Sequence, residues 1–223
     1  MPFGPRTAPR GTEGRQEEEI SDSFDAETRM AQVLGQPPRI APQADGEYSE
    51  RVRELLEKLR ARYGGSEPGE IHETFRTLLR HHEATEAYLE LGVLLTLDPA
   101  LPARDKELAI LRTAWLCGAP IPWGEHVENG RMVGLDSADF ERLTIGAAAP
   151  GWNEADRAIV RAAEELHFGA MISDETWAAL AARLDERQLI ELPIVVGHYH
   201  MTAFLQNSLR FAAREGNQGL AAR

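Results

Sequence analysis

Cysteine is almost absent from this chain, which has a single one, Cys117, among 223 residues. An intramolecular disulfide is therefore excluded, and the low cysteine content is typical of a reducing compartment. The sequence has no Cys–His zinc spacing and no HExxH pattern, so we expect no metal site. The glycine-rich motifs GxGxxG and GxxxxGK are also missing, and we expect no nucleotide, flavin or nicotinamide cofactor.

Basic charge and long apolar runs are scarce as well. The 24 Lys and Arg residues are outnumbered by 36 Asp and Glu residues, which gives a formal net charge of −12. Nucleic-acid binding needs basic patches, so we expect no nucleic-acid partner. No apolar run is long enough for a transmembrane helix, and the N-terminus lacks the apolar region of a signal peptide. We therefore expect a cytoplasmic protein with no membrane partner, whose ligand is a small molecule.

Alternating apolar and polar residues, the mark of β-strands, do not extend over any useful length. Apolar residues instead recur at helical spacing, so the predicted fold class is all-α. Asp136, Asn153 and Ser173 are placed to cap three of the helices. The expected helical segments are 48–63, 71–79, 83–97, the two halves of 104–134, 138–145, 154–168, 174–183 and 185–213, the last with a kink at Pro193.

Residues 1–46 differ from the rest in their proline content and their cluster of acidic residues. Such a composition cannot bury enough surface to order itself, and it predicts a flexible arm. A weak amphipathic pattern at 24–34 leaves open that this segment packs on a neighbouring subunit. Residues 47–215 are expected to form one all-α domain.

The stretch 104–135 has the clearest pattern in the chain. Two amphipathic segments flank a Gly-Ala-Pro-Ile-Pro break, and Glu107 borders the apolar face of the first segment. Trp123 and His126 share one side of the second segment. If the two helices form a hairpin, Glu107 and His126 can meet in an apolar pocket and transfer protons.

Each candidate also has a plainer interpretation. Glu107 is favoured in a first helical turn by the helix dipole, and His126 can be a satisfied core histidine. Trp123 either packs or forms a pocket wall, while Glu125 points to another side of its helix and is expected on a solvated face. Arg112 fits a substrate carboxylate and a structural ion pair equally well. His198, Tyr199 and His200 are expected to line the pocket only if their apolar segment is central.

Three short motifs carry a resemblance to a known family. They are ELAILR at 107–112, WGEH at 123–126 and GRMVGL at 130–135. This pattern resembles the carboxymuconolactone decarboxylase family, and the C-terminal segment 172–211 looks like its longer members. The resemblance implies an alkylhydroperoxidase D-like (AhpD-like) helical bundle with a central helix hairpin, assembled as a homo-oligomer, most often a trimer or hexamer. It also implies cofactor-free decarboxylation of an unsaturated lactone, with Glu107 and His126 sharing the proton transfer and Trp123 shaping the pocket.

The same superfamily includes dithiol peroxidases, whose pattern resembles Cys-x-x-Cys-x-x-x-His. Counting back from His126 places Ala119 and Pro122 at the two thiol positions. Because neither can be a thiol and Cys117 has no partner, the sequence disfavours dithiol peroxidase chemistry. A non-catalytic helical oligomer or small-ligand binder remains the alternative to a lyase.

Overall fold

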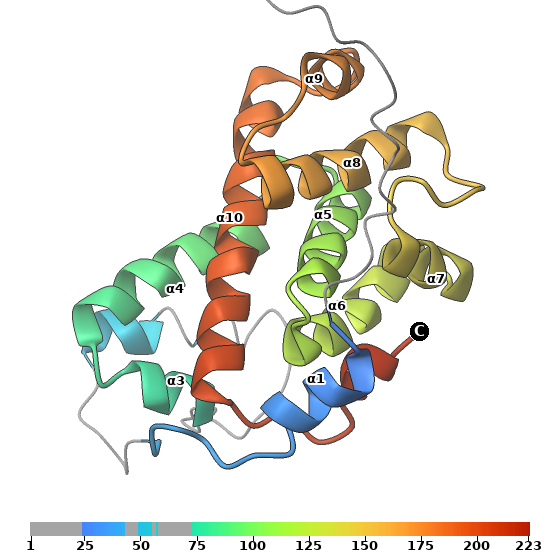
Figure 1. Cartoon of the computed structure of the whole chain (residues 1–223). Coiled ribbons are helices and arrows are strands. Elements are labelled where there is room, and N and C mark those ends of the chain that lie inside the picture. The colour runs from blue at the N-terminus through green and yellow to red at the C-terminus, as the bar shows by residue number, and fades with distance from the viewer. Residues whose placement is uncertain (1–23, 43–48, 55–56, 58–72) are drawn as a thin grey trace, which may run out of the picture.

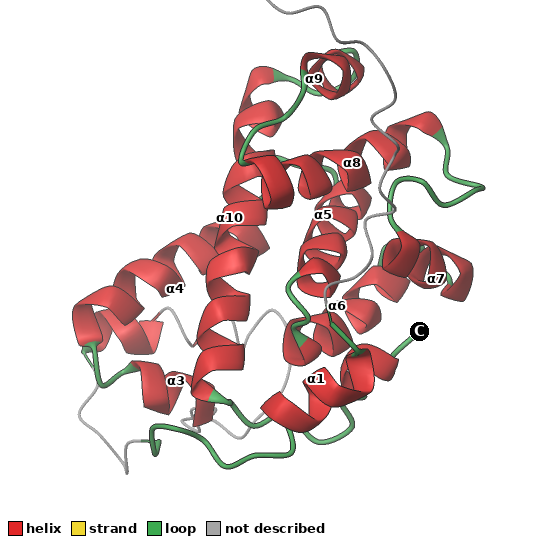
Figure 2. Cartoon of the chain, viewed as in Figure 1, coloured by secondary structure: helices red, strands yellow, loops and turns green. Residues whose placement is uncertain are grey.

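The computed structural model describes residues 24–42, 49–54, 57 and 73–223, and within these residues it contains helices and loops but no strand (Figures 1 and 2). The predicted all-α class is therefore confirmed. The helices are α1 (Ala26–Val33), α3 (Glu73–Leu78), α4 (His82–Leu97), α5 (Ala103–Leu116), α6 (Pro120–Met132), α7 (Ser137–Ile145), α8 (Glu154–Gly169), α9 (Asp174–Ala181), α10 (Glu186–Leu209) and the 3₁₀-helix η1 (Gly219–Ala221). Most of the helix expected at 48–63 lies outside the described residues.

Side-chain caps set the starts of the helices in the C-terminal half. In each case the side chain of the capping residue accepts a hydrogen bond from a backbone N–H in the first turn, which would otherwise lack a partner. Two of these starts are full capping boxes, in which the third helical residue also accepts from the backbone of the cap. The capping residues are Asp136 for α7, Asn153 for α8, Ser173 for α9 and Asp185 for α10.

Helix α5 lies at the centre of the fold, and every residue from Glu107 to Leu116 is buried. It packs against α6, α7, α8 and α10, which surround it in Figure 1. The main hydrophobic core includes residues of α5 together with residues of these four helices. A helix that is buried on all sides must find partners for its charged residues, because an unpaired charge in the core is costly.

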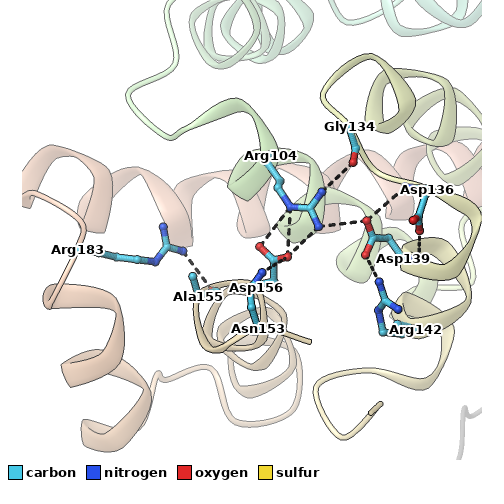
Figure 3. Close-up of polar contacts among 9 residues, drawn as sticks. All are labelled: Arg104, Gly134, Asp136, Asp139, Arg142, Asn153, Ala155, Asp156 and Arg183. Carbon is cyan, nitrogen blue, oxygen red and sulfur yellow. Dashed lines mark hydrogen bonds and ion pairs between the residues drawn. The ribbon is translucent and has the colours of Figure 1, made fainter. Parts of the chain in front are cut away.

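Arg104, in the first turn of α5, meets this requirement for the helix start (Figure 3). Its guanidinium binds the Asp156 carboxylate of α8 at 2.8 Å and the Asp139 carboxylate of α7 at 3.1 Å. It also donates to the backbone oxygen of Gly134, before α7, at 3.0 Å. One arginine therefore ties the starts of three helices together.

Helix α10 has 24 residues and contains Pro193 in its interior. Proline lacks the N–H that an α-helix uses at that position, so one turn of α10 has a carbonyl without its usual helical partner. In the part of the chain that the structure describes, no helix is long and apolar enough to span a membrane.

The first and the last described segments of the chain pack onto the central hairpin. Within the segment expected to be a flexible arm, residues 24–42 are described, and α1 packs against α6, α10 and η1 of the same chain. The ring of Phe24 lies 6.0 Å from that of Trp115 on α5. At the other end, the indole N–H of Trp123 donates to the backbone oxygen of Ala222 at 3.1 Å. The packed body thus includes part of the expected arm and continues past residue 215 to the C-terminus.

We expect Asp139→Asn to lower the free energy of unfolding at neutral pH by about 1–3 kcal/mol, because Arg104 and Arg142 would lose a buried anionic partner. Burial opposes ionisation of Asp139, but hydrogen bonds from Arg142, the Asp136 backbone and Arg104 outweigh it and hold its pKa below the ordinary value. A lowered pKa stabilises the fold above the unfolded-state pKa, and this stabilisation is lost as the pH falls through the folded value.

The difference between wild type and Asp139→Asn should therefore shrink below about pH 4, near the carboxyl pKa of the unfolded chain. Urea unfolding at a series of pH values measures it. Asp136→Asn is the matched control, since Asn also caps helices and should cost little at any pH. A wild-type advantage that stayed constant down to pH 2 would rule out this role for the Asp139 charge.

The packing of the C-terminal segment on α6 depends on Gly124. A Cβ atom there would lie 1.9 Å from Oδ1 of Asn217, whose amide nitrogen donates to the backbone oxygen of Ile121 at 3.0 Å. We expect Gly124→Ala to destabilise the protein by about 1–3 kcal/mol through this overlap. In an Asn217→Ala background the same change should stabilise by up to about 1 kcal/mol, because alanine favours helix over glycine. Denaturant unfolding of wild type, Gly124→Ala, Asn217→Ala and the double variant tests this. If Gly124→Ala destabilised the wild type and the Asn217→Ala variant equally, the explanation would be wrong.

Candidate active site

Glu107 and His126 meet at the interface of α5 and α6. The Oε2 atom of Glu107 lies 2.6 Å from Nδ1 of His126, although the residues are 19 positions apart. The hairpin is possible because Gly118 adopts a positive φ of 54° in the turn and Pro120 opens α6, where a missing N–H costs little. Both side chains are buried, with exposed fractions of 5% for Glu107 and 8% for His126. The pair is therefore largely shielded from solvent.

A third group extends this pair. The Tyr199 hydroxyl, from α10, lies 2.9 Å from Nε2 of His126, and the two rings meet edge to face at 4.9 Å. Glu107, His126 and Tyr199 thus form a continuous hydrogen-bonded chain across three helices. Tyr199 is half-buried, so it is the most exposed of the three residues.

The chain has a defined direction when Glu107 is ionised. A carboxylate only accepts hydrogen bonds, so Nδ1 of His126 must carry the hydrogen. In the neutral ring Nε2 is then an acceptor, and the Tyr199 hydroxyl donates to it. The histidine is therefore held at both nitrogens in one orientation.

Trp123 forms part of the packed wall beside His126 rather than an open surface. Its side chain is fully buried, and its ring lies 4.9 Å from that of Trp115. The guanidinium of Arg223 lies 5.4 Å from the Trp115 ring centre and 5.8 Å from that of Trp123, within cation–π range. The C-terminal residues therefore cover the tryptophan side of the hairpin.

Arg112 lies at a different interface, where α5 meets α7 and α8. Its guanidinium pairs with the Glu164 carboxylate at 2.9 Å and donates to the backbone oxygens of Leu143 and Thr144. These contacts match the ion-pair interpretation of Arg112. Glu125 lies on the outer side of α6, where its carboxylate is 3.8 Å from Arg214.

Three consecutive residues of α10 point to three different neighbours. His198 stacks on Tyr88 of α4 at 4.9 Å, Tyr199 meets His126 of α6, and His200 lies 2.8 Å from Nδ1 of His167 on α8. Burial lowers the pKa of His198 to about 4, and its buried Nδ1 has no hydrogen-bond partner. The structure therefore does not place His198 and His200 on one surface.

The sequence left open that Tyr199 lines the pocket together with His198 and His200, but it did not indicate the contact of Tyr199 with His126. Its signal was only its place in the His-Tyr-His run, and the helical period does not tell which of the three faces α6. Another group that sequence spacing did not reveal combines Cys117, His167 and His200, whose ligand atoms lie within 4.8 Å of one another.

Comparison with known proteins places the pair in a family context. The sequence model of the Carboxymuconolactone decarboxylase family matches residues 82–165, which include Glu107, Trp123 and His126. Together with the solved structures described next, this match supports a relationship to the carboxymuconolactone decarboxylase/AhpD-like superfamily. Tyr199 lies outside the matched region. No functionally curated protein shows a significant sequence match to the chain.

Solved structures share the fold at low sequence identity. An uncharacterised peroxidase-related protein from Silicibacter sp. TM1040 is 14% identical, with a TM-score of 0.62 over 82% of this chain and 96% of that one. The debrominase Bmp8, as a cysteine-to-alanine variant with 2,3,4-tribromopyrrole, is 12% identical, with a TM-score of 0.61 over 81% and 94%. A protein of unknown function from Agrobacterium tumefaciens, proposed to be the antioxidant defence protein AhpD, is 19% identical, with a TM-score of 0.54 over 59% and 90%. These likenesses support an AhpD-like helical fold for this chain.

Proposed function

We propose that this protein is a cofactor-free lyase of the carboxymuconolactone decarboxylase type, acting on a small unsaturated lactone that carries a carboxylate. The observation that supports this most strongly is the buried chain from Glu107 through His126 to Tyr199. Among the related folds, Bmp8 is bound to 2,3,4-tribromopyrrole, a small unsaturated ring, which supports a ligand of that size.

The proposed reaction breaks the bond between the ring carbon and its carboxylate. The electron pair moves into the conjugated carbonyl as CO₂ leaves, and the resulting dienolate then takes one proton on carbon. The enzyme must therefore stabilise the developing oxyanion and supply that proton. No electron acceptor or metal is needed to balance the reaction.

The hydrogen-bonded chain suits the supply of this proton. When the chain holds one extra proton, the His126 imidazolium donates from Nδ1 to Glu107 and from Nε2 to the Tyr199 oxygen. The phenolic hydrogen of Tyr199 is then free to point at the substrate carbon. Transfer from Tyr199, followed by transfer from Nε2 to the Tyr199 oxygen, leaves His126 as a neutral imidazole beside the Glu107 carboxylate. One proton from solvent then restores the imidazolium before the next turnover. In this proposal Tyr199 touches the substrate, His126 resupplies its proton and Glu107 holds the imidazole.

Thiol-based peroxidase chemistry fits this chain poorly. The two positions that carry thiols in the dithiol members are Ala119 and Pro122, and both are buried at the start of α6. Burial raises the pKa of the Cys117 thiol to about 12, so it is protonated at neutral pH and a weak nucleophile. A redox reaction at Cys117 would also need a second thiol from another molecule.

Glu107→Gln and His126→Asn should each lower the rate of lactone decarboxylation on the order of 10² to 10⁴-fold, because each removes a group from the proton chain. Tyr199→Phe, which removes only the hydroxyl, should fall in the same range. The double variant of Glu107 and His126 should lose little more than the worse single variant, since the residues act together. Product analysis and CO₂ release, with a panel of γ-carboxylated unsaturated lactones, measure the rates.

Glu125→Gln is the matched control, because it neutralises a carboxylate of α6 that does not contact His126, and it should cost much less. If Glu125→Gln abolished turnover while Glu107→Gln did not, the carboxylate assignment would be wrong. If wild-type protein with an intact fold turned over none of the lactones but bound them, the non-catalytic ligand-binding alternative would replace the lyase.

We also propose that the chain forms a homo-oligomer through α10. Four apolar residues on this helix are exposed in the single chain, from 39% for Met201 to 63% for Ile190, and they follow a four–three spacing through Gly197. Gly197 has open space around the position of a Cβ atom, which permits close approach of another helix. A 3.5-residue apolar repeat is typical of a helix–helix seam. The stripe comprises Ile190, Ile194, Gly197, Met201 and Phe204.

Replacing both Ile190 and Ile194 by Glu should shift the protein to a smaller assembly, because like charges would face each other across an apolar seam. Light scattering at micromolar concentration measures the mass, and the resemblance to the family predicts a trimer or hexamer for wild type. Met132→Glu, at an exposed position on α6, is the control and should leave the mass unchanged. A monomeric wild type would contradict the proposal.

A further inference from the structure

We propose that Cys117, His167 and His200 form a transition-metal site, best suited to Zn²⁺, that is separate from the proton chain. The three residues come from the end of α5, from α8 and from α10, which lie side by side in the fold. One ligand atom from each lies within 4.8 Å of the other two. A thiolate with two imidazoles is a ligand set that favours zinc over the hard cations Ca²⁺ and Mg²⁺.

The hydrogen bonds already orient one imidazole for metal binding. Nδ1 of His200 lies 2.8 Å from the backbone oxygen of Val196, so Nδ1 must carry the hydrogen and Nε2 is left with its lone pair. That lone pair faces Nδ1 of His167 at 2.8 Å. Such a second hydrogen bond, from the far nitrogen to a carbonyl, is the usual support of a metal-binding histidine.

The spacing of the three atoms is close to what a tetrahedral zinc ion needs. With zinc–nitrogen bonds of about 2.0–2.1 Å and a zinc–sulfur bond of about 2.3 Å, the ligand atoms stand roughly 3.3–3.6 Å apart. The two imidazole nitrogens would separate by about half an ångström, and His167 would carry its proton on Nε2 instead. The Cys117 sulfur would also have to move closer to the two nitrogens. Side-chain rotation allows this movement, because all three residues are only half-buried.

Zn²⁺ binding at the cluster requires a Cys117 thiolate. Burial, the nearby His200 and Arg112 lower the pKa of His167. Burial is the main cause of the raised pKa of Cys117, and the positive charge of Arg29 partly offsets this increase. Zn²⁺ binding must therefore release the Cys117 proton, and the resulting thiolate faces both the metal and Arg29.

Three protein ligands leave the fourth zinc position open. That number is typical of sites that hold a water or a small anion as the fourth ligand. Beside the cluster, the Asn207 amide nitrogen donates to the backbone oxygens of Cys117 and Gly118, while its buried side-chain oxygen has no hydrogen-bond partner. This unpaired acceptor is available to a zinc-bound water.

The test uses full-length protein stripped of metal with a chelator. Titration with ZnCl₂ in a calorimeter should show one Zn²⁺ bound per chain with release of a proton, and a rise in the thermal unfolding midpoint. Titration with Co²⁺ should give a tetrahedral spectrum with a thiolate-to-cobalt charge-transfer band. Cys117→Ser should remove that band, and His167→Gln and His200→Gln should each weaken Zn²⁺ binding by at least tenfold.

Two controls separate this site from others. His81→Asn, which changes an exposed histidine at a helix cap, should bind Zn²⁺ as wild type does, and so should Glu107→Gln, which acts only on the proposed proton chain. Circular dichroism of every variant checks the fold. The proposal is overturned if folded wild type binds no Zn²⁺ at micromolar concentration, if the Cys117→Ser complex with Co²⁺ keeps the wild-type spectrum, or if Glu107→Gln abolishes binding.

Discussion

The burial of charged residues on α5 is the constraint on which the rest of the structure depends. This helix lies in the core, so each of its buried charges needs a partner, and each partner comes from another part of the chain. Glu107 contacts His126 on α6, Arg112 contacts Glu164 on α8, and the Asp105 carboxylate lies 2.6 Å from Nη1 of Arg183, after α9. Breaking one partner from a buried pair typically costs several kcal/mol, because a charge is left without compensation. The surrounding helices are thus fixed in position by ion pairs as well as by apolar packing.

This arrangement explains how the hydrogen-bonded chain of Glu107, His126 and Tyr199 is held inside a small helical domain. An isolated buried Glu or His would favour its neutral form. Without a hydrogen-bond partner, its side chain would also be free to change orientation. The contacts at both nitrogens of His126 and the packing of Trp123 against the C-terminal segment remove that freedom. The same interactions that satisfy the core also orient the candidate catalytic groups, so stability and proposed function share residues at this site.

The helices could be predicted well from the sequence, because their signals are local. Asp136, Asn153 and Ser173 cap the helices they were expected to cap, and the Pro-rich break separates α5 from α6. What could not be predicted depends on contacts between distant segments. The amphipathic pattern at 24–34 was too weak to show that α1 packs on its own chain, and nothing local indicates that Ala222 accepts from Trp123.

The two candidate sites also differ in whether local sequence signals reveal them. Glu107 and His126 are recognisable because a short hairpin links their helices and their spacing matches a known motif. The cluster of Cys117, His167 and His200 has no linear spacing at all, since its members come from three helices that meet only in the folded chain. Linear motif searches detect metal sites built on one or two adjacent elements, and they miss those assembled by tertiary packing.

Helix α10 connects the two proposed centres through adjacent residues. Side chains one position apart on an α-helix differ in direction by about 100°, so Tyr199 and His200 necessarily face different neighbours. Tyr199 completes the proton chain on α6, while His200 completes the metal cluster with α8. A rotation of α10 about its axis would disturb both contacts at once. The orientation of this one helix, held by the apolar core on its inner side, is therefore a common requirement of both sites.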